Sequence, residues 1–266
     1  MKANKNQFTI VLISLMILCF LWVFYMKQNT DDNQVNVEIA GTSETMSVDE
    51  SLILSDAKTY TTAAATSTTL PDQFQLNVPF ISQYPELPTG CEITALTEAL
   101  AYYGFEEDKQ DLARRYLRMD TKKTTGCFIE YFLGSPWSER GIGCFAPTIT
   151  NAANAYLKDV GSSLQAYTLS YNALNSLFSE VASGHPVIIW TSSDYSDTDV
   201  SYNEIPLDNG QTFSWPENEH CVVLSGYDLK NKTVTIADPT DGIVVHDLNQ
   251  FTYFYQKYFY QAVVIK

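Results

Sequence analysis

The first pattern along the chain is an uninterrupted apolar run at residues 8–26, 19 residues without a charge. At about 1.5 Å per residue a helix of this length reaches roughly 28 Å, close to the hydrocarbon thickness of a membrane. Lys2 and Lys5 precede the run, and the positive-inside rule therefore predicts a short cytoplasmic tail at 1–7. A cleaved signal peptide is the alternative, but its apolar region is usually shorter and a small-residue cleavage site follows it. We expect a single-pass anchor with the rest of the chain outside the membrane.

Residues 27–71 have the opposite pattern, with many Asp, Asn, Ser, Thr and Ala residues and no sustained apolar periodicity. Seven acidic residues stand against two basic ones, Lys27 and Lys58, in this stretch. Such a composition cannot bury enough apolar surface to fold. We predict a disordered acidic linker, and a single folded domain at 72–266.

Within 72–266, helical periodicity is clearest at 91–103. Ile93, Leu96, Leu100 and Tyr103 fall on one face of a helix, and Gly104 is a suitable C-terminal stop.

Two β-branched runs, 222–226 and 233–237, are separated by a polar turn that contains Asp228, Lys230 and Asn231. This pattern predicts an antiparallel hairpin. Further strands are expected at 187–191 and within 260–265. The fold class is therefore α+β, with a helical part packed on an antiparallel sheet.

Composition narrows the choice of function. The chain carries a net charge of −15, and 72–266 alone carries 12 bases against 24 acids. No basic surface is available to neutralise a run of phosphates, so nucleic acid is excluded as a partner. The five cysteines are too few for a disulfide framework in a chain of this length.

Three residues suggest nucleophilic chemistry. Cys91 opens the predicted helix, where unpaired N–H groups and the helix dipole stabilise a thiolate. The predicted hairpin brings His220 and Asp238 together at its open end, and a carboxylate beside an imidazole orients a general base. Strand alternation puts Cys221 on the face opposite His220, as a packed core thiol. A lone Cys or His is more often structural, so it is the combination that favours catalysis.

The stretches VPFISQYPELPTGCEITALTEALAYYGF, GHPVIIWT, HCVVLSGYD and TVTIADPTDG resemble the stand-alone bacterial branch of the double-glycine leader peptidases, which are papain-like cysteine peptidases that process bacteriocins. The resemblance covers most of 72–266. It implies that Cys91 is the nucleophile, His220 the general base and acid, and Asp238 the carboxylate that orients His220. It also implies that the Gln83 amide and the Cys91 backbone N–H form the oxyanion hole. No cofactor or metal is implied.

The peptidase domain of a bacteriocin exporter is fused to a transporter and faces the cytosol, whereas this domain is expected outside on a tether. Leader removal during export is therefore not implied. We expect a membrane-tethered, extracytoplasmic cysteine peptidase at the bacterial cell surface, with a peptide or protein substrate that includes cell-envelope peptides among its candidates. Acyl or peptidyl transfer on the same fold and a non-catalytic tethered binding module are the alternatives, and the oligomeric state is left open.

The remaining candidates have simpler interpretations. His185 and His246 are expected to have loop or strand-end roles. Cys127 and Cys144 could close a disulfide worth about 3 kcal/mol, and the sequence leaves this open. The acidic segment 194–219 lacks the spacing of a calcium loop, so we expect a solvated loop. Because it leads directly to His220, it could cover the cleft and favour neutral or cationic substrates.

Overall fold

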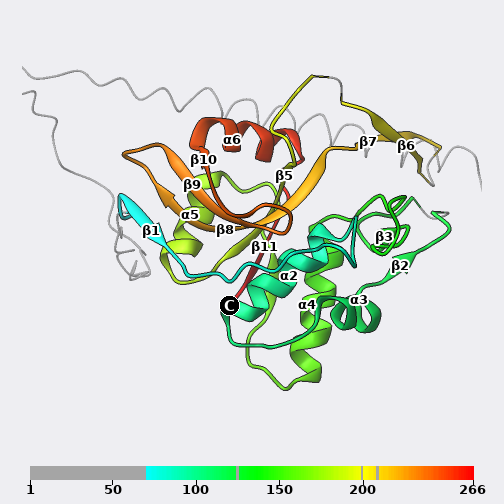
Figure 1. Ribbon diagram of the computed structural model, residues 1–266, viewed down its shortest axis with the longest axis horizontal. Helices are drawn as coiled ribbons and strands as arrows, with labels where there is room; N and C mark the ends of the chain where they lie inside the picture. Colours follow the sequence, from blue (N-terminus) through cyan, green and yellow to red (C-terminus); the bar gives the residue numbers. More distant parts are fainter. Residues whose placement is uncertain (1–69, 124–125, 199, 208–209) are drawn as a thin grey trace, which may run out of the picture. The chain divides into compact units, whose positions relative to one another are not determined.

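The computed structural model describes residues 70–266, apart from 124–125, 199 and 208–209 (Figure 1). The predicted tail, anchor and all but the last residues of the linker therefore lie outside the described residues. Among the helices that are described, none is both long and apolar enough to cross a membrane.

A seven-stranded sheet forms the centre of the described domain, and the predicted α+β fold is confirmed (Figure 1). The strand order is β10-β9-β8-β5-β11-β4, with β1 paired to β8, and every pairing is antiparallel. Each of the four strands expected from the sequence is present. The strands are β1 Gln73–Gln75, β4 Ala166–Thr168, β5 Val187–Ser192, β8 Glu219–Asp228, β9 Thr233–Asp238, β10 Gly242–Asp247 and β11 Ala262–Ile265.

The β8–β9 hairpin folds about the predicted turn. Asp228 pairs with Thr233, and the Asp228 carboxylate accepts the backbone N–H of Asn231 at 2.8 Å. The pairing shifts by one residue between Leu224 and Gly226, where β8 has an irregularity. Because the hairpin closes at this turn, the start of β8 and the end of β9 lie at its open end, as the sequence predicted.

Helix α2, Cys91–Tyr102, packs on β8 and is buried from Cys91 to Leu100. Its end is followed by Gly104, whose φ of +86° suits a residue without a side chain. Helices α3 and α4 pack on α2, whereas α5 contacts β8 and α6 contacts β5 (Figure 1). The bounds of these helices are α3 Lys109–Tyr116, α4 Ala146–Asp159, α5 Leu174–Ala182 and α6 Leu248–Lys257.

The acidic segment 194–219 differs from the expected solvated loop, because it contains a two-stranded hairpin, β6 Tyr202–Pro206 and β7 Thr212–Pro216. Trp215 in β7 is fully buried and stacks on Phe145, with 4.6 Å between ring centroids. The buried contact between Trp215 and Phe145 holds this segment against the domain although its composition is acidic. A short parallel pair, β2 Met119–Asp120 and β3 Phe132–Leu133, completes the described strands.

Candidate active site

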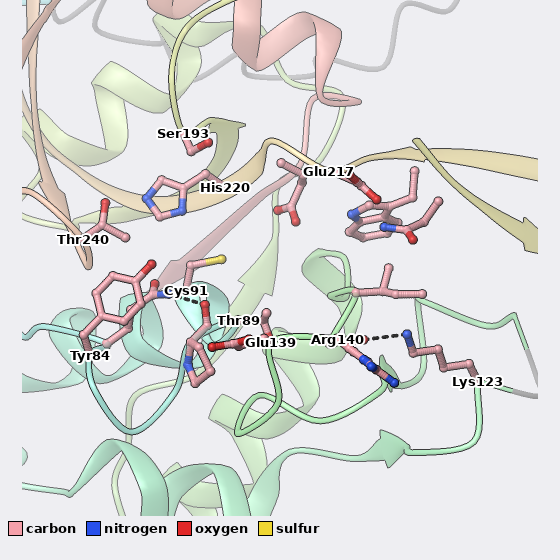
Figure 2. A pocket seen from close by; sticks show the side chains of 17 residues that line it. Tyr84, Thr89, Cys91, Lys123, Glu139, Arg140, Ser193, Glu217, His220 and Thr240 are labelled. Carbon is pink, nitrogen blue, oxygen red and sulfur yellow. Dashed lines mark hydrogen bonds between the residues drawn. The ribbon is translucent and has the colours of Figure 1, made fainter. Parts of the chain in front are cut away.

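A pocket of about 650 Å³ lies between the N-terminus of α2 and the start of β8 (Figure 2). Three of the four predicted site residues line it, and the fourth, Asp238, contacts one of them. Figure 2 shows His220 near Cys91, with the Cys91 sulfur pointing to one side of the imidazole, Thr240 beside His220, and Lys123 and Arg140 further from His220. The lining residues are Gln83, Tyr84, Pro88, Thr89, Cys91, Lys123, Glu139, Arg140, Gly141, Ile142, Ser193, Asn203, Trp215, Glu217, Glu219, His220 and Thr240.

His220 and Asp238 form the contact that the hairpin predicted. His220 Nε2 lies 2.7 Å from Asp238 Oδ1, and both side chains are buried. The same oxygen accepts the Thr240 backbone N–H at 2.8 Å and the Thr240 hydroxyl at 2.7 Å. Burial alone would raise the pKa of Asp238, but the hydrogen bonds from His220 and Thr240 and the His220 charge lower it to about 2. The carboxylate is therefore ionised, and Nδ1 of His220 remains available for another partner.

Cys91 is the first residue of α2, after Gly90 at the N-cap. Its side chain is buried, and its sulfur donates to Glu92 Oε2 at 3.4 Å. Burial raises the pKa of the thiol, the carboxyl groups of Glu92 and Glu219 raise it further, and the Cys221 backbone N–H lowers it only in part.

The sequence-based expectation of a thiolate stabilised by the helix N-terminus is therefore wrong for this conformation. A helix N-terminus contributes about 0.3–1 kcal/mol, which is less than one unit of pKa. Burial of a charged group shifts a pKa by up to several units. The desolvation of Cys91 and the two nearby carboxyl groups consequently outweigh the dipole.

Gln83 lies at the pocket wall with 3% of its surface exposed. Its Nε2 donates to the Pro88 carbonyl at 3.1 Å, and its Oε1 has no hydrogen-bond partner. The Gln83 backbone N–H donates to the Pro239 carbonyl at 2.8 Å. Since an amide NH₂ group has two donor hydrogens, one remains for an oxygen in the pocket. The second Nε2 hydrogen of Gln83 can therefore donate to an oxyanion that forms in the pocket.

Sequence reasoning missed three glutamates near these residues, of which Glu92 and Glu98 are buried and Glu219 is half-buried. Glu98 lies in α2, and its Oε1 accepts the Ile81 backbone N–H at 2.9 Å. Burial raises its pKa to about 8. Glu92 and Glu219 lie beside Cys91, and burial raises the pKa of both, that of Glu92 to about 7. Their only signal in the sequence is adjacency, because Glu92 follows Cys91 and Glu219 precedes His220.

The sulfur of Cys91 and one oxygen each of Glu92 and Glu219 lie within 4.8 Å of one another, a spacing that a metal ion could also occupy. The Cys91 thiol and Glu92 are already hydrogen-bonded to each other, and Glu92 Oε1 accepts the Cys144 backbone N–H at 2.8 Å. We interpret these three residues as a hydrogen-bonded group within the chain rather than as metal ligands.

The other candidates have structural environments. Cys221 is fully buried, which confirms its prediction as a core thiol. Cys144 is a free buried thiol, so the alternative of a disulfide with Cys127 is not formed in the structure. His185 Nδ1 lies 3.2 Å from the hydroxyl of Tyr103, and His246 is in β10, where its ring stacks on Tyr195.

Comparison with known proteins identifies the family. Residues 75–263 match the Peptidase_C39 like family, and the chain belongs to it. This confirms the resemblance to double-glycine leader peptidases and, at the level of the family, the prediction of a cysteine peptidase.

A candidate C39-like peptidase from Bacillus anthracis has a similar crystal structure, with a TM-score of 0.63 and 32% identity over 73% of this chain and 97% of that one. The uncharacterized protein YvpB of Bacillus subtilis strain 168 is 27% identical over 165 residues, which are 58% of this chain. The match spans 60% of the length of YvpB. The crystal structure of the peptidase domain of Streptococcus ComA is a more distant neighbour, with 14% identity, a TM-score of 0.41, and coverage of 71% of this chain and 96% of that one.

Proposed function

We propose that this protein is a cysteine peptidase that cleaves a peptide or amide bond with Cys91, His220, Asp238 and Gln83. The observation that carries the proposal is the pocket of about 650 Å³, which is lined by Cys91, His220 and Gln83 and backed by the 2.7 Å contact between His220 and Asp238. A thiol, an oriented imidazole and an amide donor around one cavity are the groups that acyl transfer to sulfur requires. Membership of the Peptidase_C39 like family supports the same reaction class.

In this mechanism, the Cys91 thiol transfers its proton to His220 and the sulfur attacks the carbonyl carbon of the substrate. Asp238 stabilises the imidazolium that forms, and the free N–H of Gln83 with the Cys91 backbone N–H stabilises the oxyanion. The imidazolium then protonates the departing amine, which leaves an acyl-enzyme. His220 activates water for hydrolysis of the thioester, and the Cys91 thiol is regenerated.

The attack requires the Cys91 sulfur to turn from its contact with Glu92 towards His220. Among the hydrogen bonds of the described residues, the sulfur has one to Glu92 and none to His220. Rotation about the Cα–Cβ bond of Cys91 turns the sulfur without movement of the backbone, and both Cys91 and His220 line the same pocket (Figure 2).

The pocket favours a polar substrate with no strong net charge. Glu139, Glu217 and Glu219 contribute acidic groups to its lining, and Lys123 and Arg140 contribute basic groups. The sequence-based expectation of neutral or cationic substrates considered only the acidic segment. Lys123 and Arg140 offset part of this acidity. We propose peptides or proteins, including cell-envelope peptides, as the substrate class.

Acylation of Cys91 in the full chain, purified in a mild detergent, tests the reaction. A panel of peptide thioesters would be added, and intact mass spectrometry would follow acyl-enzyme formation in a single turnover. We expect Cys91→Ala to abolish acylation. Gln83→Ala should slow it by on the order of 10²-fold with little change in substrate affinity, because one oxyanion donor is lost.

Gln256→Ala is the matched control, since Gln256 is an exposed glutamine of α6 outside the pocket. Equal acylation of the wild type, Gln83→Ala and Gln256→Ala, with equal melting temperatures, would contradict the catalytic assignment. A binding module predicts that outcome. Addition of an amine such as glycinamide would separate hydrolysis from transfer, because a transferase forms the amide product.

The proposed location rests on the apolar run 8–26 and the charges that flank it. Protease added outside intact cells should cut within 27–71 and release a fragment of about the size of 72–266. Protection of the entire chain until the membrane is permeabilised would place the domain in the cytosol.

A further inference from the structure

Two carboxyl groups lie against the nucleophile candidate. Glu92 comes from α2 and Glu219 from β8, and one oxygen of each lies within 4.8 Å of the Cys91 sulfur and of the other. Gly143, from a third segment of the chain, lies next to both carboxyl groups. A Cβ atom built on Gly143 would lie 2.8 Å from Glu92 Oε1 and 3.2 Å from Glu219 Oε2. The two acids are therefore packed together under a glycine that leaves no room for a side chain.

The hydrogen bonds of the pair are incomplete. Glu92 accepts the Cys144 backbone N–H and the Cys91 thiol. Glu219 Oε1 is buried and has no hydrogen-bond partner. Two carboxylates this close to each other repel, and a proton retained on one of them relieves both the repulsion and part of the desolvation.

The groups around the sulfur supply little compensating positive charge. Helix α2 contributes two titratable neighbours, Glu92 and, near Cys221, Glu98. Strand β8 contributes Glu219, His220 and Cys221. The segment before α4 contributes Cys144. His220 is the one whose charge favours ionised Glu92. The basic Lys123 of the pocket donates instead to the Arg140 carbonyl at 2.6 Å.

From this geometry we propose that Glu92 and Glu219 are positioning residues for Cys91: they share one proton beside its sulfur, and loss of that proton suppresses the thiolate. The proposal deepens the proposed function, because it rests on Cys91 as the nucleophile. Its consequence is a peptidase that works best on the acid side of neutrality. Burial raises the pKa of both carboxyl groups, that of Glu92 to about 7, so negative charge develops beside the sulfur as the pH rises through about 7.

The direction of the effect follows from Coulomb's law. A carboxylate within 4.8 Å of a thiolate opposes its ionisation, so a negative charge on either glutamate raises the pKa of the Cys91 thiol. Replacement of one glutamate by glutamine removes the charge and keeps the shape. The Cys91 thiol should then ionise at lower pH.

Alkylation by iodoacetamide measures this ionisation without a substrate. The full chain in mild detergent would be labelled from about pH 5.5 to 9.5, and peptide mass spectrometry would separate Cys91 from the other cysteines. We expect Glu219→Gln to increase the Cys91 rate at about pH 8 by about tenfold or more over the wild type. Glu219→Asp, which keeps the charge, should stay near the wild type.

Glu217→Gln is the matched control, because Glu217 is an exposed glutamate two residues away that lines the same pocket. We expect its alkylation profile to stay within about twofold of the wild type. If Glu219→Gln does not fold, Glu92→Gln tests the same charge from α2. Profiles for Glu219→Gln and Glu92→Gln that match that of Glu217→Gln would overturn the proposal.

The outcome is independent of turnover. If the glutamine variants shift the alkylation profile of Cys91 but the wild type forms no acyl-enzyme, the proposal for the carboxyl pair stands and the peptidase function is rejected. If the wild type forms an acyl-enzyme but the variants leave the alkylation profile unshifted, the peptidase function stands and the proposal for the carboxyl pair is rejected.

Discussion

The polar groups on the two walls of the pocket differ in the direction of their pKa shifts. On the wall formed by the sheet, the buried Asp238 carboxylate accepts three hydrogen bonds, one from His220 and two from Thr240, and its pKa falls to about 2. On the wall headed by α2, burial raises the pKa of Cys91 and Glu92, and Gln83 Oε1 has no partner. Both walls are buried, so burial by itself does not explain the difference.

The difference lies in the number of donors that meet each charge. Desolvation of a carboxylate is offset when several N–H and O–H groups point at it, as they do at Asp238. Cys91 instead faces two more acids and a single backbone N–H. Asp238 is therefore ionised before substrate arrives, whereas the Cys91 thiol stays neutral until a partner or a proton transfer changes it.

The largest expected effect comes from removal of the charge of the sheet wall. Asp238→Asn should lower the acylation rate by on the order of 10²-fold or more, because the amide neither stabilises the imidazolium nor fixes the tautomer of His220. Single-turnover acylation measures it, with Asp241→Asn, an exposed neighbour, as the control. If the two variants acylate equally fast, the sheet wall is not the preorganised half of the site.

Removal of one donor should have a smaller effect. Thr240→Val keeps the backbone N–H to Asp238 and removes the hydroxyl at 2.7 Å. We expect kcat to fall by up to about tenfold with KM nearly unchanged, since a hydrogen bond to a charged group contributes about 1.5–3 kcal/mol and only part of it reaches the transition state. Thr240→Ser should restore the rate. A change in KM alone would instead indicate direct contact with substrate.

The remaining effect concerns stability rather than rate, on the helix wall. The pKa of Glu98 is about 8 in the folded protein and about 4.3 in an unfolded chain, so the folded state binds more protons between these values. Its contribution is fully present below about pH 4.3 and is lost as the pH rises towards about 8. In Glu98→Gln this part of the pH dependence should disappear, and thermal melting at pH 5 and pH 8 should differ less than in the wild type.

Glu106→Gln, a change at an exposed glutamate, serves as the control for that experiment. Its melting temperature should follow the wild type at both pH values. A wild-type difference that persists unchanged in Glu98→Gln would show that Glu98 is ionised in the folded protein and that the two walls are alike.

The sequence by itself determined the sheet wall and the start of α2. Apolar periodicity located the helix that begins at Cys91, and two β-branched runs about a polar turn located β8 and β9. A hairpin joins residues close in sequence, and its register follows from the turn. The contact between His220 and Asp238 could therefore be predicted before any tertiary structure was available.

Only the tertiary structure decided what surrounds Cys91. The position of Glu219 beside Glu92 joins residues from α2 and β8 that are far apart in sequence, and no periodicity encodes such a contact. The hairpin within 194–219 likewise depends on Trp215 packing against Phe145, which lies before α4. Local patterns fix elements and neighbours along the chain. The ionisation of a buried group depends on every element packed against it, because desolvation and charge act through space.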